Sequence, residues 1–156
     1  MNNNAICAAI VTRLQADQGS GALFATGGGA GLITGVYRNE APSTATFPYI
    51  VFSVTTEADR NTFRGDIFEV SIDFGIYVPV SSPPSVVDTI VDRLYGDATV
   101  QTSGEPTFGL HRHPLTLSTG TWSGGTLEMK GTQDASDRDY YIEIDTYKFI
   151  QSRTSP

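Results

Sequence analysis

A strict alternation of apolar and polar side chains runs through residues 67–78, IFEVSIDFGIYV. Successive side chains of an extended chain point to opposite faces, so this pattern predicts a long β-strand with one buried face. The buried face would consist of Phe68, Val70, Ile72, Phe74, Ile76 and Val78. Such a strand is stable only when other strands pair with it and a second layer covers its apolar face.

Three further segments have the composition of strands that could complete the sheet. Residues 49–56 follow Pro48 and are apolar on both faces. That pattern fits a strand covered by helices on one side and by a loop or a neighbouring subunit on the other. A short strand is predicted at 35–42 and a long one at 138–151. The apolar side of the last strand changes after Thr146, which predicts a bulge or a strand covered on both faces.

The connections between these strands are rich in glycine and polar residues. We expect a glycine-rich loop at 19–35 and, at 57–66, a charged hairpin connection whose tip leaves the sheet. The segment 108–119 fits a strand interrupted at Pro114, and Gly124-Gly125 predicts the turn of a further hairpin.

Two segments have the spacing of amphipathic helices. Residues 3–17 place apolar side chains four residues apart, and 79–97 repeat them at the i, i+3, i+4 spacing. Ser82 or Ser85 is the expected N-cap of the second helix, and Gly96 its end. The predicted fold class is α+β: a largely antiparallel β-sheet with two α-helices packed on one face and extended hairpin loops. We expect one domain over residues 1–156, with 151–156 as a mobile tail.

Composition excludes several classes of function. Charged residues make up only 17% of the chain and its net charge is −7, so it lacks the basic footprint of a duplex-binding protein. The low charged fraction suggests a surface that partners cover. Cys7 is the single cysteine, which excludes an intrachain disulfide and predicts a buried thiol. We find no signal peptide and no apolar stretch long enough to span a membrane, so the chain is expected to be made in the cytoplasm.

The sequence offers few candidates for chemistry. The TGGGAG segment, 26–31, lacks the Gly-Lys-Ser/Thr ending of a phosphate-binding loop, so a flexible loop is favoured. His111 and His113 would share a face of a strand, but a metal site needs a third ligand from elsewhere, so surface histidines are favoured. Trp122 is equally compatible with a contact surface and with the core.

Two acidic pairs complete the list of candidates. Glu69 with Asp73, and Glu143 with Asp145, could do acid–base work, line the solvated side of a sheet, or form the rim of a ring. Neither pair has a nucleophile or a base nearby in the sequence. We therefore predict no catalytic residue, no bound metal and no cofactor, and a structural role for the chain in place of an enzymatic one.

The order of these motifs resembles that of the tail terminator (tail completion) family of long-tailed bacteriophages and gene transfer agents. A helix ending in RLQAD precedes GVYRNEAPSTATFPYIVFSV, in which the VY and PYIVF pieces are similar to the family's pattern. A charged hairpin then leads to FEVSIDFGIYV, followed by a helix with VVDTIVDRL and a strand DYYIEIDTYKF. The similarity covers most of residues 3–97 and the last strand, whereas residues 98–137 match poorly.

The resemblance implies a hexameric ring on the head-proximal end of the tail tube. Such a ring ends tube polymerisation and joins the tail to the head–tail connector, and DNA passes through its lumen without specific binding. The expected partners are therefore other copies of this chain, the tail tube protein and a neck protein, and the expected location is the virion, with no membrane involved.

Residues at the predicted hairpin and at Trp122 are our candidates for subunit or tube contacts, because long polar loops without another role often bind partners. They are Glu57, Asp59, Arg60, Asn61, Phe63, Arg64 and Trp122. The stretch 115–135 is a further candidate. Glu69 and Asp73 are candidates for an acidic lumen lining that repels DNA phosphates. Two alternatives remain: another neck or head-completion protein of the same particle, and a small α+β ligand-binding domain or enzyme.

Overall fold

A computed structural model of the chain describes residues 3–19, 21–24, 31–62, 65–96, 108–115, 122–123 and 126–153. For Asn3 and residues 56–62, 65–68, 122–123 and 150–153, this description covers the backbone alone. The helices are α1 (Asn3–Gln15) and α2 (Ser85–Tyr95). The strands are β1 (Gly35–Arg38), β2 (Tyr49–Thr62), β3 (Gly65–Pro79), β4 (Trp122–Ser123), β5 (Leu127–Asp134) and β6 (Tyr140–Arg153).

The strands form one mixed sheet in the order β1-β2-β3-β6, with β4 and β5 both paired to the free edge of β6. Only β1 and β2 run parallel, and the other pairs are antiparallel. The α+β fold class with a largely antiparallel sheet is thus confirmed. Trp122 lies opposite Arg153 and Leu127 opposite Phe149, so β4 and β5 follow one another along the same neighbour. The expected hairpin at Gly124-Gly125 is therefore wrong, because the long β6 supplies the partner for both segments.

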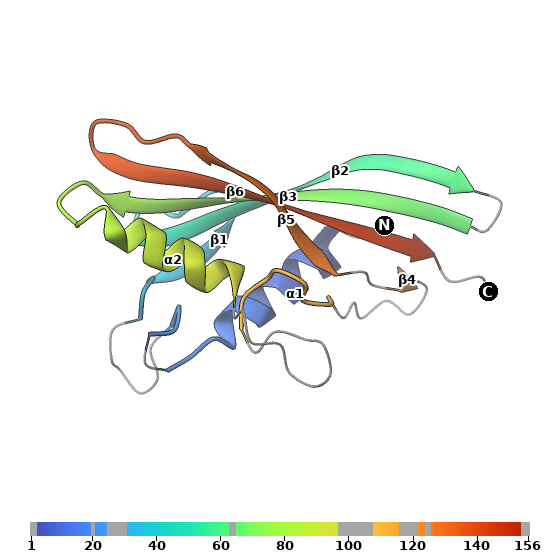
Figure 1. Cartoon of the computed structure of the whole chain (residues 1–156), viewed down its shortest axis with the longest axis horizontal. Helices are drawn as coiled ribbons and strands as arrows, with labels where there is room; N and C mark the ends of the chain where they lie inside the picture. Colours follow the sequence, from blue (N-terminus) through green and yellow to red (C-terminus); the bar gives the residue numbers. More distant parts are fainter. Residues whose placement is uncertain are drawn as a thin grey trace.

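The paired strands extend further than expected. β2 and β3 remain paired as far as Thr62 opposite Gly65, with a register shift between Thr56 and Ala58. The prediction of a loop over 57–66 was therefore wrong for 57–62 and 65–66. β6 also continues to Arg153, which corrects the expected mobile tail at 151–153, while 154–156 lie outside the described residues. Pairing satisfies backbone groups that a loop would leave to water. Figure 1 shows the ends of β2, β3 and β6 reaching past both helices.

Both helices cover the same face of the sheet (Figure 1). The predicted stripe of α1 is buried at Ile6, Ile10 and Leu14. The stripe of α2 is buried in the same core. They pack on Ile50 and Phe52 of β2 and on the even-numbered residues 70–78 of β3. The side-chain alternation of β3 is thus the physical cause of the two-layer arrangement. None of the helices in the described part of the chain is long and apolar enough to span a membrane.

The ends of α2 differ partly from expectation. Pro84 is the N-cap residue and makes no side-chain capping bond, so neither Ser82 nor Ser85 caps the helix. Gly96 ends it, as predicted, with φ at 119°. The backbone at Gly109 packs directly on Gly96: a Cβ on Gly109 would lie 2.2 Å from the Cα of Gly96. Glycine is required at this crossing, which holds residues 108–110 against the end of α2.

β6 pairs with β3 without interruption, so it contains no bulge. The irregular register lies in β5 instead, between Met129 and Gly131. The apolar residues of β6 change faces along the strand: those near its start lie on the face away from the helices, and those near its end lie on the face under the helices. Tyr147 and Phe149 point into the core under the helices, and both are fully buried. Ile142 and Ile144 lie on the opposite face and are half-buried.

Candidate functional site

The face of the sheet opposite the helices is the candidate site, and we call it the open face. It carries the odd-numbered residues among 49–55 of β2 and 69–79 of β3 and the even-numbered residues among 140–148 of β6, because directly opposed residues of antiparallel strands point to the same side. One half of the open face is apolar and the other half is polar. Described helices cover only the opposite face (Figure 1).

Four tyrosines and a phenylalanine form the apolar half, which we call the aromatic patch. It consists of Tyr37, Phe47, Tyr49, Tyr77 and Tyr140, with Val51, Ile142 and Ile144 beside them, and all are half-buried. The ring of Phe47 stacks on Tyr49 at 4.8 Å between centroids and on Tyr140 at 4.7 Å. Tyr49 also stacks on Tyr77 at 5.2 Å, and Tyr37 meets its edge at 5.9 Å. The rings therefore form one continuous cluster across β1, β2, β3 and β6.

Two glycines make room for this cluster. A Cβ on Gly35 would lie 2.5 Å from the hydroxyl oxygen of Tyr37, and a Cβ on Gly75 would lie 3.0 Å from the ring of Tyr77. Each tyrosine ring thus lies over the glycine two residues before it, on the same face of the strand. Burial raises the pKa of Tyr49, and the neighbouring hydroxyls of Tyr77, Tyr140 and Tyr37 raise it further. The patch consists of ring atoms and phenol hydroxyls packed against one another.

The polar half of the open face holds the two acidic residues considered for a lumen. Asp73 is exposed and accepts a hydrogen bond from the Thr146 hydroxyl at 2.7 Å. Glu69 is half-buried and forms an ion pair with Lys148 at 3.4 Å. The structure therefore brings both residues to one face, as the four-residue spacing predicts, and each has a partner on β6.

The other candidate contact residues that the structure describes lie on β2 and β4. Glu57, Asp59, Arg60 and Asn61 belong to β2. Phe63 and Arg64 lie outside the described residues. Trp122 is in β4, opposite Arg153 of β6. These backbone positions place the paired ends of β2, β3, β4 and β6 together, away from the helices (Figure 1). Residues 20 and 25–30 of the glycine-rich segment 19–35 also lie outside the described residues.

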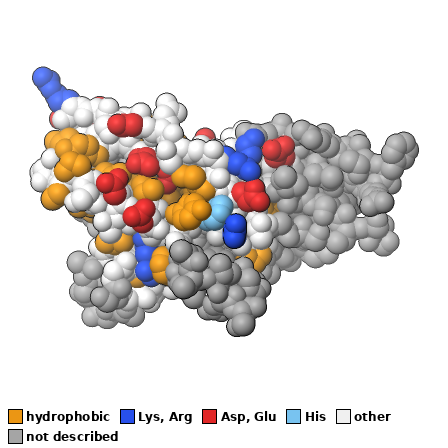
Figure 2. All heavy atoms as spheres, in the orientation of Figure 1, with side chains coloured by type: hydrophobic (Ala, Val, Ile, Leu, Met, Phe, Trp, Pro, Cys, Tyr) orange, Lys and Arg blue, Asp and Glu red, His pale blue; other side chains and the backbone are white. Residues whose placement is uncertain are grey.

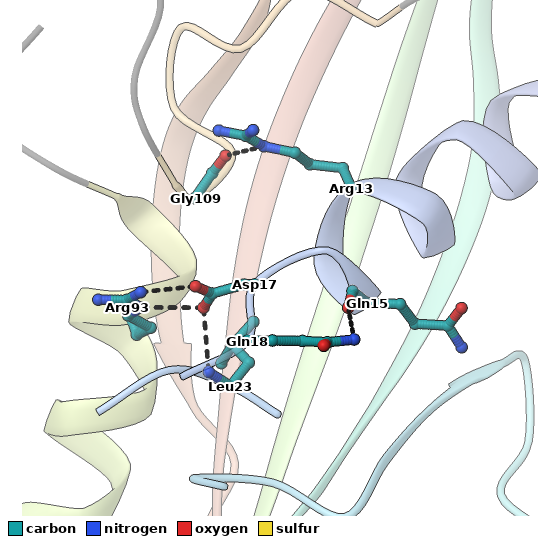
Figure 3. A network of polar contacts seen from close by, with 7 residues as sticks. All are labelled: Arg13, Gln15, Asp17, Gln18, Leu23, Arg93 and Gly109. Atoms are coloured by element: carbon teal, nitrogen blue, oxygen red, sulfur yellow. Dashed lines mark hydrogen bonds and ion pairs between the residues drawn. The ribbon is translucent and has the colours of Figure 1, made fainter. Parts of the chain in front are cut away.

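A polar network holds the two helices together (Figure 3). Asp17, just after α1, accepts hydrogen bonds from Arg93 of α2 at 2.5 and 2.9 Å, and from the backbone N–H of Leu23 at 3.0 Å. Arg13 donates to the carbonyl of Gly109 at 3.0 Å. Burial by itself would raise the pKa of Asp17, but the bonds from Arg93 and Leu23 outweigh it and lower that pKa. We interpret this network as structural, since each contact joins two packed segments.

The two histidines have separate environments. His111 stacks on Tyr95 at 4.5 Å between centroids, and its Nδ1 accepts a hydrogen bond from the backbone of Met129 at 3.2 Å. His113 lines a hollow of about 440 Å³ against α1, together with Arg13 and several alanines. Burial, and secondarily Arg13, lower the pKa of His113 to about 4. Neither histidine belongs to any of the strands β1–β6, so the expectation that the two share a face of a strand is wrong. Among the described residues, no group of three acidic, histidine or cysteine side chains could hold a metal ion.

Asp145 occupies an unexpected place. It lies on the helix-facing side of β6, is fully buried, and neither of its carboxylate oxygens has a hydrogen-bond partner. The interpretation of Glu143 and Asp145 as the solvated side of a sheet was therefore wrong for Asp145. Burial, with a further contribution from Glu143, raises the pKa of Asp145 to about 7. Cys7 is buried as predicted, and burial raises the pKa of its thiol.

Comparison with known proteins adds support for the fold only. No family model matches the chain, and no curated protein matches it. One solved structure, known by a locus tag alone, aligns over 100% of this chain and 99% of its own with a TM-score of 0.55. The sequence identity between the two is 13%, so the match shows a shared fold and carries no functional assignment.

Sequence reasoning missed the aromatic patch. The signal was present, because Tyr49 and Val51 alternate with buried residues in β2, and Tyr140, Ile142 and Ile144 share a face of β6. Only the strand order reveals that these residues, with Tyr37 and Tyr77, converge on one surface.

Proposed function

We propose that this chain is a structural subunit of a phage-type virion, which assembles with copies of itself into a ring that ends and caps the tail tube. The observation that carries the proposal is the aromatic patch on a sheet face that described helices leave uncovered. Aromatic residues are enriched at protein interfaces, and a subunit whose second sheet face carries rings needs a neighbour to cover it.

Other properties support an assembly role. The order of motifs resembles the tail terminator family, and the charged fraction of 17% is low for a freely soluble surface. The paired ends of β2, β3 and β6 extend past the helices and supply a second region for contacts with neighbours or with the tail tube protein. In this proposal the partners are other copies of the chain, the tail tube protein and the head–tail connector, and DNA passes through the ring.

The direct test is to mix the purified chain with polymerising tail tube protein of the same particle. We expect ring-shaped particles in negative-stain images of the chain alone, and tubes that stop growing with a ring at one end when it is added. Sedimentation at increasing concentration gives the mass of the ring. If the chain stays monomeric and tube growth is unchanged when it is added, the proposal is wrong.

The same experiment separates the alternatives. Another neck or head-completion protein of the particle would form an oligomer that binds the connector but not the tube end. A small ligand-binding domain would remain monomeric with either partner. No described group of residues favours that last class, since the histidines are separate and Asp145 is sealed in the core.

A further inference from the structure

Two apolar surfaces lie on opposite layers of the molecule. Among the described residues, the large hydrophobic side chains with the greatest exposure are Val80 and Tyr95, at 43% and 40%. Val80 directly follows Pro79, whose strand partner Tyr140 belongs to the aromatic patch on the open face. Tyr95 ends α2 in the helix layer and stacks on His111. One chain therefore presents two different apolar surfaces that face different directions.

The charges around these two surfaces have opposite signs. The segment 134–139 leads into Tyr140 and carries three aspartates against one arginine, and Asp134, Asp137 and Asp139 are all exposed. Beside Tyr95 and His111 lie the exposed side chains of Arg112 and Lys130, with Glu128 paired to Lys130 at 2.8 Å. Burial lowers the pKa of His111, as do the positive charges of Arg112 and Lys130, whereas Glu128 opposes them.

We define the α2 corner as Tyr95, His111, Arg112 and Lys130. The histidine atoms near the middle of Figure 2 lie between hydrophobic side chains on one side and a group of charged, partly basic side chains on the other. On the other side of the histidine in that view, acidic side chains lie among hydrophobic and uncharged ones. The corner is thus an aromatic spot bordered by two basic side chains, one of them paired with Glu128, on a chain of net charge −7.

We infer that the aromatic patch of one copy binds the α2 corner of the next copy, so that the acidic border of the patch faces the basic border of the corner. The inference rests on the proposed function, for which it supplies the contact between subunits. Because the two surfaces differ, the contact is head-to-tail, and such contacts build rings when the rotation between subunits closes.

A second copy of this chain is the partner that the charges favour. Two copies with a net charge of −7 repel one another over most of their surfaces. Opposite charges at the borders relieve that repulsion in one orientation, and tyrosine rings supply the packing. A symmetric contact of open face against open face would instead place the two acidic borders in one interface, where like charges oppose binding.

Four variants test the contact by sedimentation velocity over a range of concentrations. Tyr77→Ser in the patch and Tyr95→Ser in the corner should each weaken association by about tenfold or more, as expected for central aromatic residues. Asp139→Arg and Arg112→Asp should each weaken it by roughly three- to tenfold. Asp88→Arg makes the same charge change as Asp139→Arg at the start of α2, and should leave association unchanged.

The decisive result is the double variant Asp139→Arg/Arg112→Asp. It exchanges the two border charges, so association should return to within about threefold of the original chain. Thermal melting of each variant shows that the monomer still folds. The inference is wrong if the double variant associates as weakly as the two single charge variants. It is also wrong if Tyr77→Ser weakens association and Tyr95→Ser does not.

The outcomes also separate this inference from the proposed function. A chain that caps tail tubes, and whose association is unaffected by the corner variants, would keep the function and overturn the inference. If exchanging the two border charges restores association but the original chain never caps a tube, the inference is supported and the proposed function is overturned.

Discussion

The carboxyl group of Asp145 determines one pH dependence that we expect of this fold. Its pKa rises from the ordinary value of 3.8 to about 7 in the folded state, chiefly through burial and secondly through Glu143. Between those values the folded chain keeps a proton that the unfolded chain releases, so stability falls as the pH rises from about 4 to about 7. Asp145→Asn should therefore increase the free energy of unfolding at pH 8 by on the order of 2 kcal/mol.

Urea unfolding of the Asp145→Asn chain and of the original chain at pH 5 and pH 8 measures this effect. The gain should be smaller at pH 5, where Asp145 already carries a proton. Asp92→Asn, at an exposed position of α2, is the control and should show no such difference between the two pH values. An equal gain at both pH values would contradict the assignment.

Asp17 depends on pH in the opposite sense. The pKa of its carboxyl is lowered by Arg93 and by the N–H of Leu23 against the effect of burial, so its stabilising contribution is present at neutral pH and is lost as the pH falls below about 4. Arg93→Ala leaves a buried carboxylate without its charged partner. We expect it to cost roughly 2–4 kcal/mol at pH 7 and less at pH 3.

Thermal or urea unfolding at the two pH values checks this second prediction. Arg138→Ala removes an exposed arginine from the β5–β6 connection and should change stability by no more than about 0.5 kcal/mol. A loss for Arg93→Ala that is the same at pH 3 and pH 7 would mean that Arg93 acts through packing, for example over the ring of Phe108.

At the scale of the elements, one end of the β2–β3 hairpin packs under the helices and the other end extends beyond them (Figure 1). The described core of these strands lies at Ile50, Phe52 and residues 70–78, whereas the pairing continues to Thr62 and Gly65. Deleting residues 58–65 should therefore leave a folded monomer, as judged by circular dichroism and a cooperative melt, that assembles poorly into rings. Normal ring formation by the shortened chain would remove this hairpin from the list of contact regions.

At the scale of the whole molecule, the acidic residues of the open face test which surface lines the proposed ring. Glu69 and Asp73 share that face. If they border the DNA passage, replacing both with lysine should slow DNA ejection while leaving ring assembly measurable, because positive side chains would hold the phosphates.

Glu69→Gln/Asp73→Asn is the matched control, since it removes both charges with little change in shape. It should affect ejection less than the lysine pair, although it also weakens the contacts to Lys148 and Thr146. Unchanged ejection by the lysine variant would place these residues away from the passage.

The amino-acid sequence by itself determined the two helices, the central strand and the buried sides of these three elements. The alternation at 67–78 specified the core face of β3, and the four-residue spacing specified the stripe of α1, because strand and helix periods are local properties of the backbone. Local pattern also predicted the end of α2 at Gly96.

Only the tertiary structure decided which residues meet. The length of the hairpin, the shared edge of β4 and β5, and the burial of Asp145 depend on strand pairing between segments far apart in the chain. The aromatic patch has the same origin: Tyr37, Tyr49, Tyr77 and Tyr140 each look ordinary in their own strands. Their rings converge because register aligns them on one face, and register is a long-range property that no local period contains.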